Sequence, residues 1–347
     1  MKKYILLCSS LFLVILSFAQ PKQYRVINFG FYNLENFYDT IDQPNVDDYD
    51  FTPNGTNHYN AQIFWDKVNH LADVVSLIGT DETPDGLAFF GVAEIENKSV
   101  LETLANHPKL KSRNYQSILF DGPDLRGVDC GFMYNPNYFK VLYTSSNIVD
   151  LKAVKLDNRP TRDVLYVKGI LNGTDTVHVF VNHWPSRRGG TEGSAPKRNI
   201  AAAVSKRMID SLMAINPNTK VVNMGDLNDN PTDESMTKVL GCVDKKEKCK
   251  PGGLFNPWVD FYKKGIGTLG YNDTWSLFDQ QVISYGWLTH DQSGYFYKGA
   301  HIFSRDFMIT KTGKYKGYPK RTWDFAIYNS GYSDHFPTYI TIIKEVK

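Results

Sequence analysis

Several apolar segments of the sequence end in polar side chains that are costly inside a hydrophobic core. The clearest is VVNMGDLNDNP at 221–231, where an apolar run leads into Asp226 and Asn228. These two residues share strand parity, so their side chains leave the backbone on the same side. A buried carboxylate is unfavourable unless a charge or a hydrogen-bond donor meets it. A turn that uses Asp and Asn would give the same pattern in this stretch alone.

The same arrangement recurs along the chain. Other apolar runs contain or lead into Asn33, Glu35, Glu94, Asn182, His183, Asp279, Asp334 and His335. Each of these residues could be a satisfied structural group when taken alone. Because the strand ends of stacked sheets converge at one rim, together they predict a cluster of carboxylates, amides and imidazoles that needs a cation.

The side-chain types indicate which cation and which reaction. Carboxylate and amide oxygens without cysteine favour Mg²⁺, with Mn²⁺ or Ca²⁺ as alternatives. Two histidines beside such a site suit phosphoryl chemistry. Hydrolysis of a phosphoester needs an activated water, charge relief on the phosphate oxygens and a proton for the leaving oxygen. These residues supply all three.

The motifs also resemble a known family. The ordered segments are YNLEN, VAEIEN, RGVDCGFMYNP, VNHWPSRRGG, NMGDLND, SLFDQQVIS and GYSDHFP. Together they resemble the endonuclease/exonuclease/phosphatase superfamily, the DNase I-like hydrolases, and most of all its secreted bacterial members. The resemblance covers nearly the whole chain after the first twenty residues. It implies a four-layered α/β sandwich with the active site at one rim.

The resemblance implies a metal site built from acidic residues. Glu94 would be the principal metal ligand, Glu35 a second acidic contact found in some members, and Asp334 a residue at the metal edge. Asn33 would hold the metal-site carboxylate or the phosphate.

The resemblance also implies the catalytic roles. Asp226 would orient and deprotonate the attacking water, and Asn228 would help to place it. His335 would bind and neutralise the phosphate while Asp279 fixes its tautomer. His183 would contact the phosphate or protonate the leaving oxygen.

Two of these assignments stay open. The aspartate that orients the histidine is Asp279 in SLFDQQVIS or Asp306 in FSRDFMIT, and the apolar residues after Asp279 favour the first. The general base is Asp226 or His335, because coupled groups resist a single assignment.

Loop arginines are the expected substrate contacts. Arg forks suit phosphate oxygens, and Arg126 and Arg188 are the two predicted to bind them. Overall charge does not identify the substrate. The formal charge is +2, and loss of Lys2 and Lys3 with a leader segment brings it to about zero. No global basic field therefore marks a nucleic-acid partner, although local patches can serve.

Periodicity predicts the elements that must position these groups. Helices are expected at 59–79 and at 196–215, the second beginning at a proline, and 242–273 is expected to be a partly irregular excursion. Strands are expected at 24–34, 87–95, 115–120, 130–134, 164–170, 176–184, 220–226, 279–284, 306–310 and 338–343. Short strands dominate, and the few helices do not alternate strictly with them. This order of elements predicts the α+β class, with two packed, mainly antiparallel sheets flanked by helices.

The first residues match the three-part pattern of a secretory signal. Two lysines, an apolar run and a small-residue site predict cleavage after Ala19, which leaves one catalytic domain at 20–347. A membrane anchor is the alternative, but the apolar run is short and has no charged stop behind it. The pattern predicts a secreted or periplasmic, extracytoplasmic protein with no stable membrane insertion after cleavage.

Three cysteines remain after that cleavage. Cys242 and Cys249 flank the charged loop VDKKEK, which a short disulfide could close in an oxidising compartment. Cys130 lies within an apolar run and is expected to be a buried free thiol.

The sequence therefore predicts a divalent-metal-dependent phosphoesterase that hydrolyses a P–O bond by direct attack of water. DNA or RNA is the expected substrate, which makes a nuclease the leading hypothesis, and no protein partner is inferred. Lipid, sphingomyelin or sugar-phosphate esters are the alternatives, although no obvious exposed hydrophobic hairpin favours a membrane substrate. A non-catalytic binding protein on the same scaffold is the least favoured, because no catalytic group is missing.

Overall fold

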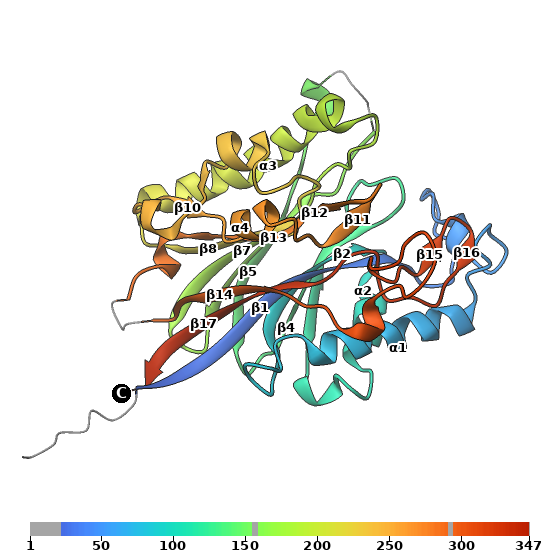
Figure 1. Cartoon of the computed structure of the whole chain (residues 1–347), viewed down its shortest axis with the longest axis horizontal. Helices are drawn as coiled ribbons and strands as arrows, with labels where there is room; N and C mark the ends of the chain where they lie inside the picture. The colour runs from blue at the N-terminus through green and yellow to red at the C-terminus, as the bar shows by residue number, and fades with distance from the viewer. Residues whose placement is uncertain (1–21, 155–158, 291–293, 347) are drawn as a thin grey trace, which may run out of the picture.

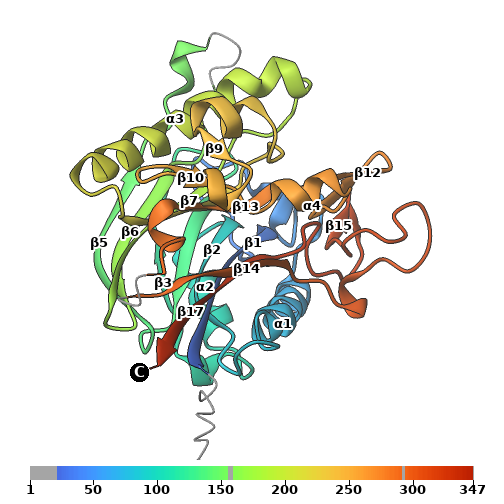
Figure 2. The same cartoon turned by 60° about the vertical axis from the view of Figure 1, so that its left-hand side comes forward.

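The computed structural model describes residues 22–154, 159–290 and 294–346. Two β-sheets pack face to face, and helices cover their outer faces (Figure 1). Helix α3 (Thr191–Ile215) lies over one sheet, while α1 (Ala61–Leu77) and α2 (Lys98–Ala105) lie on the far side of the other (Figure 2). The chain thus forms four layers.

The first sheet has six strands, and only β1 and β2 pair in parallel. In spatial order its strands are β14 (Phe296–Ile302), β17 (Thr338–Val346), β1 (Gln23–Phe37), β2 (Leu87–Ile95), β4 (Asp129–Tyr134) and β3 (Gln116–Leu119).

The second sheet has seven strands, and two of its pairs, β7 with β8 and β10 with β9, are parallel. In spatial order its strands are β5 (Phe139–Asn147), β6 (Val164–Leu171), β7 (Asp175–His183), β8 (Lys220–Asp226), β13 (Asp279–Ser284), β10 (Leu254–Phe255) and β9 (Cys242–Val243).

Shorter elements complete the described chain. Two small hairpins are formed by β11 (Leu269–Tyr271) with β12 (Thr274–Ser276) and by β15 (Trp323–Asp324) with β16 (Ile327–Tyr328). Helix α4 (Val259–Lys263) and the turns η1 (Tyr49–Phe51), η2 (Lys111–Arg113), η3 (Leu151–Ala153), η4 (Ser235–Val239), η5 (Lys246–Lys248), η6 (Tyr285–Trp287) and η7 (Asp306–Met308) lie in the connections.

Three apolar clusters hold the layers together. The largest lies between the two sheets and contains Phe29, Phe89 and Met224. A second joins α1 and α2 to the six-stranded sheet, and a third joins α3 to the seven-stranded sheet. Since each sheet is covered on both faces, the central strands are apolar on both sides. This explains the continuous apolar runs of the sequence.

The predicted fold class is confirmed: two packed, mainly antiparallel sheets are flanked by helices. One predicted strand is wrong. Residues 306–310 form the 3₁₀ turn η7 and a single bridge from Ile309 to Pro319, with Met308 buried beside the α1 cluster. Helix α3 begins at Thr191, so Pro196 lies inside it. The predicted strands also do not include β5, β14 and the short strands, in which apolar and polar residues alternate less clearly.

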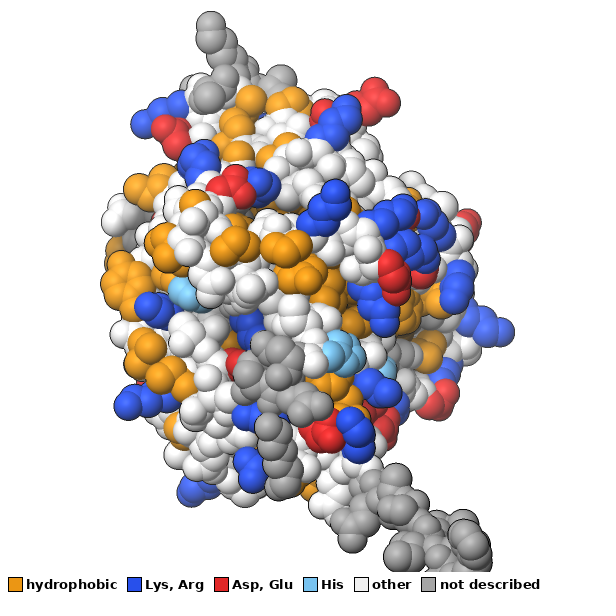
Figure 3. All heavy atoms as spheres, turned by 90° about the vertical axis from the view of Figure 1, so that its left-hand side faces the viewer, with side chains coloured by type: hydrophobic (Ala, Val, Ile, Leu, Met, Phe, Trp, Pro, Cys, Tyr) orange, Lys and Arg blue, Asp and Glu red, His pale blue; other side chains and the backbone are white. Residues whose placement is uncertain are grey.

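The thiols and the proposed leader complete the comparison with the sequence. Cys130 is buried and free, as predicted, and Cys242 and Cys249 are also free thiols. The predicted signal segment lies outside the described residues. Among the described residues, no helix has the length and apolar character that a bilayer span needs. At the end of the sandwich near the C-terminus, basic side chains are scattered among apolar and neutral ones (Figure 3).

Candidate active site

In the seven-stranded sheet, strand register places three of the predicted residues side by side. Strands β7 and β8 run parallel with His183 beside Asp226, and the antiparallel β13 begins with Asp279 opposite Asp226. Gly225 permits this close approach, because a Cβ there would lie 2.1 Å from the carbonyl oxygen of Asn182.

In the six-stranded sheet, an irregular strand end brings two more residues to the same rim. The parallel register pairs Asn33 with Ala93, so Glu94 follows at the end of the neighbouring strand. The pairing of β2 with β4 shifts between Ala93 and Ile95, and Glu94 has a φ of +61°. Such a bulge re-aims a side chain. Glu94 Oε1 accordingly lies 3.8 Å from His183 Nε2 of the other sheet.

Asp226 is the centre of the cluster and is 3% exposed. Its Oδ2 accepts a hydrogen bond from Asn33 Nδ2 at 3.1 Å. The same oxygen lies 3.6 Å from His183 Nε2 and 3.8 Å from His335 Nε2. Its Oδ1 accepts the backbone N–H of Asn228 at 3.0 Å. Groups from both sheets therefore meet at one carboxylate.

Burial and neighbouring charges set the protonation of these groups. Burial, together with repulsion from Asp279 and Glu94, raises the pKa of the Asp226 carboxyl to about 7. A general base works best when its pKa lies near the working pH. Burial and the nearby Arg162 guanidinium lower the pKa of His183, so this imidazole is neutral at pH 7.

Asp279 orients His335. The Nδ1–H of His335 donates to Asp279 Oδ2 at 2.7 Å, and both side chains are buried. Burial alone would lower the pKa of His335, but the carboxylates of Asp279, Asp226 and Asp334 raise it well above its ordinary value. The other candidate, Asp306, is 93% exposed and pairs with a lysine at the surface. The geometry therefore selects Asp279.

Backbone contacts after β7 fix the rim. Arg162, which no sequence pattern singled out, donates to the carbonyl oxygens of His183 and Trp184 at 3.1 and 2.7 Å. Its Nη1 also pairs with Asp124 Oδ2 at 2.9 Å. The Asn228 amide donates to Trp184 O at 2.9 Å. Asn228 thus holds Asp226 through its backbone, while its side chain braces the neighbouring turn.

The oxygen-rich rim fits a hard divalent cation at Glu94. Glu94 Oε2 accepts the Asn36 backbone N–H at 3.0 Å, which leaves Oε1 directed at the cluster. Asp334 lies on the same rim, with Oδ1 3.8 Å from His335 Nε2. Mg²⁺ in proteins typically keeps several waters and takes one or two carboxylates with substrate phosphates. One or both of these carboxylates meet that need.

A second grouping of ligand types is better explained without an ion. Atoms of Asp226, Asp279 and His335 all lie within 4.8 Å of one another. However, Asp279 and His335 are hydrogen-bonded to each other at 2.7 Å. That contact is typical of a histidine held by a carboxylate.

Comparison with known proteins gives the family. The model of the Endonuclease/Exonuclease/phosphatase family matches residues 28–344. The chain belongs to this family. Its members are hydrolases that act on phosphoesters. No curated protein matches the sequence.

Solved structures of the Endonuclease/Exonuclease/phosphatase family share the fold at low identity. A Bacteroides thetaiotaomicron family protein has a TM-score of 0.55 at 13% identity, covering 93% of this chain and 100% of its own. The mannosyl-6-phosphatase of the same organism has a TM-score of 0.54 at 13%, covering 92% and 100%. D. rerio TDP2, complexed with a single-strand DNA product, has 0.54 at 13%, covering 91% and 98%. These likenesses establish the architecture.

Glu35 has partners other than the expected metal. Its Oε2 accepts the backbone N–H of Thr322 at 2.7 Å, and its Oε1 that of Trp323 at 3.3 Å. Lys67 Nζ lies 4.0 Å from Oε2, and both side chains are buried. These contacts make Glu35 the anchor of the segment that leads into the β15–β16 hairpin, and its role as a second acidic metal contact stays a prediction. The φ of +50° at Glu35 turns its side chain out of strand parity.

The two arginines that were predicted to bind phosphate lie in different surroundings. Arg126 lies near the rim, where attraction to Glu94 and Asp124 outweighs burial and raises its pKa. Arg188 is exposed on the loop between β7 and α3, and no interaction among the described residues draws it to the rim.

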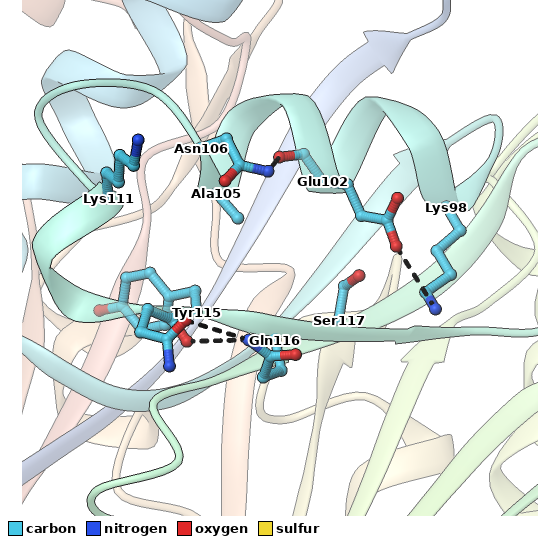
Figure 4. A pocket seen from close by; sticks show the side chains of 9 residues that line it. Lys98, Glu102, Ala105, Asn106, Lys111, Tyr115, Gln116 and Ser117 are labelled. Atoms are coloured by element: carbon cyan, nitrogen blue, oxygen red, sulfur yellow. Dashed lines mark hydrogen bonds and ion pairs between the residues drawn. The ribbon is translucent and has the colours of Figure 1, made fainter.

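A polar pocket between α2 and β3, with a volume of about 320 Å³, contains none of the clustered residues (Figure 4). Two of its lining residues, Lys98 and Glu102, form an ion pair one turn apart on α2.

Proposed function

We propose that this chain is a divalent-metal-dependent phosphodiesterase that cleaves nucleic acid by direct attack of water. The observation that carries the proposal is the meeting of Glu94, Asp226 and the His335–Asp279 pair at one rim. These groups come from both sheets and combine a hard-cation ligand, a base and a charged phosphate contact.

A divalent cation at Glu94 would relieve charge on the phosphate oxygens. Asp226, whose pKa lies near neutrality, accepts the proton of the attacking water. Asn33 and the backbone of Asn228 fix its carboxylate, each through one oxygen. His335 is charged and offers Nε2–H to a phosphate oxygen while Asp279 holds Nδ1. Such prearranged donors act without reorganisation as charge develops.

An exposed hairpin beside the rim supports a nucleic-acid substrate. The β15–β16 hairpin carries Phe325 at its tip, with 92% of its surface exposed and a φ of +53°. This corrects the expectation that no hydrophobic hairpin is exposed. Next to the hairpin, Arg321 Nη2 lies 3.6 Å from Asp334 Oδ2 at the catalytic rim. An exposed aromatic ring near a phosphate site is suited to stack on an unpaired base.

Replacing Phe325 with serine should raise the KM for single-stranded DNA about tenfold, because base stacking contributes roughly 1–3 kcal/mol per base. Hydrolysis of a small diester such as bis-p-nitrophenyl phosphate should not change, since it has no base to stack. Initial rates over a range of substrate concentrations measure both effects.

Ile215→Ser is the matched control, because Ile215 is 85% exposed at the end of α3 and far in sequence from the hairpin. Its KM should equal that of the unmodified protein. An unchanged KM in Phe325→Ser would remove the hairpin from the substrate site.

Lipid phosphoesters are the second candidate, because Phe325 and the 66% exposed Ile327 would also suit a bilayer surface. A panel separates the two. Single-stranded DNA, duplex DNA, RNA, sphingomyelin vesicles, phospholipid vesicles and mannose 6-phosphate are each tested with Mg²⁺, Mn²⁺ and Ca²⁺. Fastest turnover of single-stranded DNA supports the nuclease, and fastest turnover of vesicles assigns the site to lipids. Fastest turnover of the monoester would overturn both.

We further propose that the protein acts outside the cytoplasm, on the strength of the leader pattern in residues 1–19. Sequencing the N-terminus of the exported protein tests this. A first residue of Gln20 supports cleavage after Ala19, and an intact leader on a cytoplasmic protein contradicts it.

A further inference from the structure

The loop that leads into β15 concentrates positive charge beside the catalytic rim. Residues 311–321, KTGKYKGYPKR, contain five basic residues and no acidic one, whereas the whole chain has a formal charge of only +2. The loop lies beside the β15–β16 hairpin (Figure 2). None of its residues takes part in the proposed reaction. Because the excess of charge is local, it can serve a contact that the overall charge does not reveal.

Two lysines of this loop have no acidic partner. Lys311 pairs with Asp306, and the Lys320 ammonium donates to a backbone carbonyl at 2.8 Å. By contrast, Lys314 and Lys316 are exposed, and neither forms an ion pair with an acid in the described part of the chain. Their charges are therefore available to an anionic partner.

A row of contacts runs from Lys314 to the catalytic histidine. Lys314 Nζ and the Arg321 guanidinium carbon each lie 5.4 Å from the centre of the Tyr315 ring. Arg321 Nη2 lies 3.6 Å from Asp334 Oδ2, and Asp334 Oδ1 lies 3.8 Å from His335 Nε2. The Arg321 side chain is 30% exposed, so solvent reaches it. Positive charge therefore continues outward from the imidazole that would bind the scissile phosphate.

Packing fixes this loop relative to the catalytic histidine. The Thr310 N–H donates to Tyr318 O at 2.9 Å, and the Gly317 N–H donates to Thr310 O at 2.9 Å. The Tyr318 ring meets Trp275 edge-on, with 5.3 Å between ring centres. Trp275 in turn stacks on Phe336, the residue after the histidine. A site that is ordered before binding has less entropy to lose when a ligand arrives.

We propose that Lys314, Lys316 and Arg321 form a basic ridge that binds phosphates of a single-stranded nucleic acid beyond the scissile one. This role rests on the proposed function, because the strand held here is the strand cut at the rim. Proteins that bind single strands without sequence preference combine positive charge along the backbone with aromatic rings on which bases stack. The basic ridge supplies the charge.

The basic ridge is joined to the hairpin that supplies the aromatic ring. The Tyr315 hydroxyl donates to Asp324 Oδ1 at 3.3 Å, and the exposed Phe325 is the next residue. Charge and an exposed ring are thus adjacent. A linear polyanion that is cut at the rim can follow the row of contacts outward, which favours a nucleic-acid strand over a membrane surface.

Fluorescence anisotropy of a labelled oligo(dT) of about 16 nucleotides tests the basic ridge. Every protein carries Asp226→Asn and is measured with Mg²⁺, so that the strand is bound but is cut too slowly to matter. Replacing Lys314 and Lys316 together with glutamine should raise Kd about tenfold at low salt. The slope of log Kd against log salt concentration should fall by about 1.4, because each phosphate contact on a single strand contributes about 0.7.

Two further double variants separate a specific contact from a general effect of charge. Lys314→Arg with Lys316→Arg retains both charges and should retain the slope. Lys246→Gln with Lys250→Gln removes the same charge from another surface, because both lysines are exposed between β9 and β10, away from β15 (Figure 1). It should leave the slope unchanged.

The outcomes for the basic ridge and for the proposed function are distinct. An unchanged slope in the double glutamine variant overturns the basic ridge even if the protein cuts DNA, and so does failure to bind oligo(dT). A reduced slope in a protein that cuts no nucleic acid supports the basic ridge and overturns the proposed function alone. Tighter binding to phosphatidylserine vesicles than to oligo(dT) would assign the lysines to a membrane surface instead.

Discussion

Replacing Asp226 with asparagine should lower kcat for nucleic-acid hydrolysis by about 10²–10⁴-fold, the contribution of a positioned general base. Asparagine has nearly the same shape, so it can still accept the Asn228 N–H and fill the buried position. It cannot take a proton from water. The loss should therefore appear in kcat, with little change in KM, because the interaction removed is made in the transition state.

Initial rates with Mg²⁺ measure the effect, and far-ultraviolet circular dichroism checks the fold. Glu234→Gln is the matched control, since Glu234 is an exposed acid on the same loop and pairs only with surface groups. It should retain full activity. If Asp226→Asn retained more than about a tenth of the kcat, the carboxylate would not be the base.

The His335–Asp279 pair should behave as one catalytic unit. His335→Gln removes the charged phosphate contact and should lower kcat by about 10²–10⁴-fold. Asp279→Asn should lower it less, because the imidazole stays in place but loses the partner that holds Nδ1 at 2.7 Å. The double variant should be no worse than His335→Gln, as is typical of residues that act together.

Asp306→Asn provides the control, because the sequence offers Asp306 as the alternative orienting residue and the structure places it at the surface. Its kcat should be unchanged. If the losses of His335→Gln and Asp279→Asn multiplied in the double variant, the two side chains would act independently, against their hydrogen bond.

Much of the site could be predicted because its residues end regular strands. Asp226 ends a strand that is apolar at Val221, Val222 and Met224, and the register of β7 and β8 then places His183 beside it. Asp279 begins β13 as the apolar pattern indicates. For such residues, period-two alternation and the convergence of strand ends are sufficient guides.

Other features of the site depend on irregular backbone geometry, which the alternation of apolar and polar residues in the sequence does not encode. Glu35 and Asn36 both have a φ of +50°, so the side chain of Glu35 leaves the direction that strand parity predicts. The β15–β16 hairpin has two-residue strands, too short for any periodic signal. Arg162 acts through backbone carbonyls brought near it by the fold alone. These contacts join segments far apart in the chain, and no local pattern reports them.

The central hypothesis is that a divalent cation at Glu94 and the base Asp226 together hydrolyse a phosphodiester. Its most direct test is the rate of phosphodiester hydrolysis by the purified protein while metal is removed with EDTA and then restored with Mg²⁺. Hydrolysis should stop in EDTA and return with Mg²⁺, and Glu94→Gln should need a higher Mg²⁺ concentration for half-maximal rate. Undiminished hydrolysis in EDTA, or an unchanged Mg²⁺ requirement in Glu94→Gln, would contradict the proposed site.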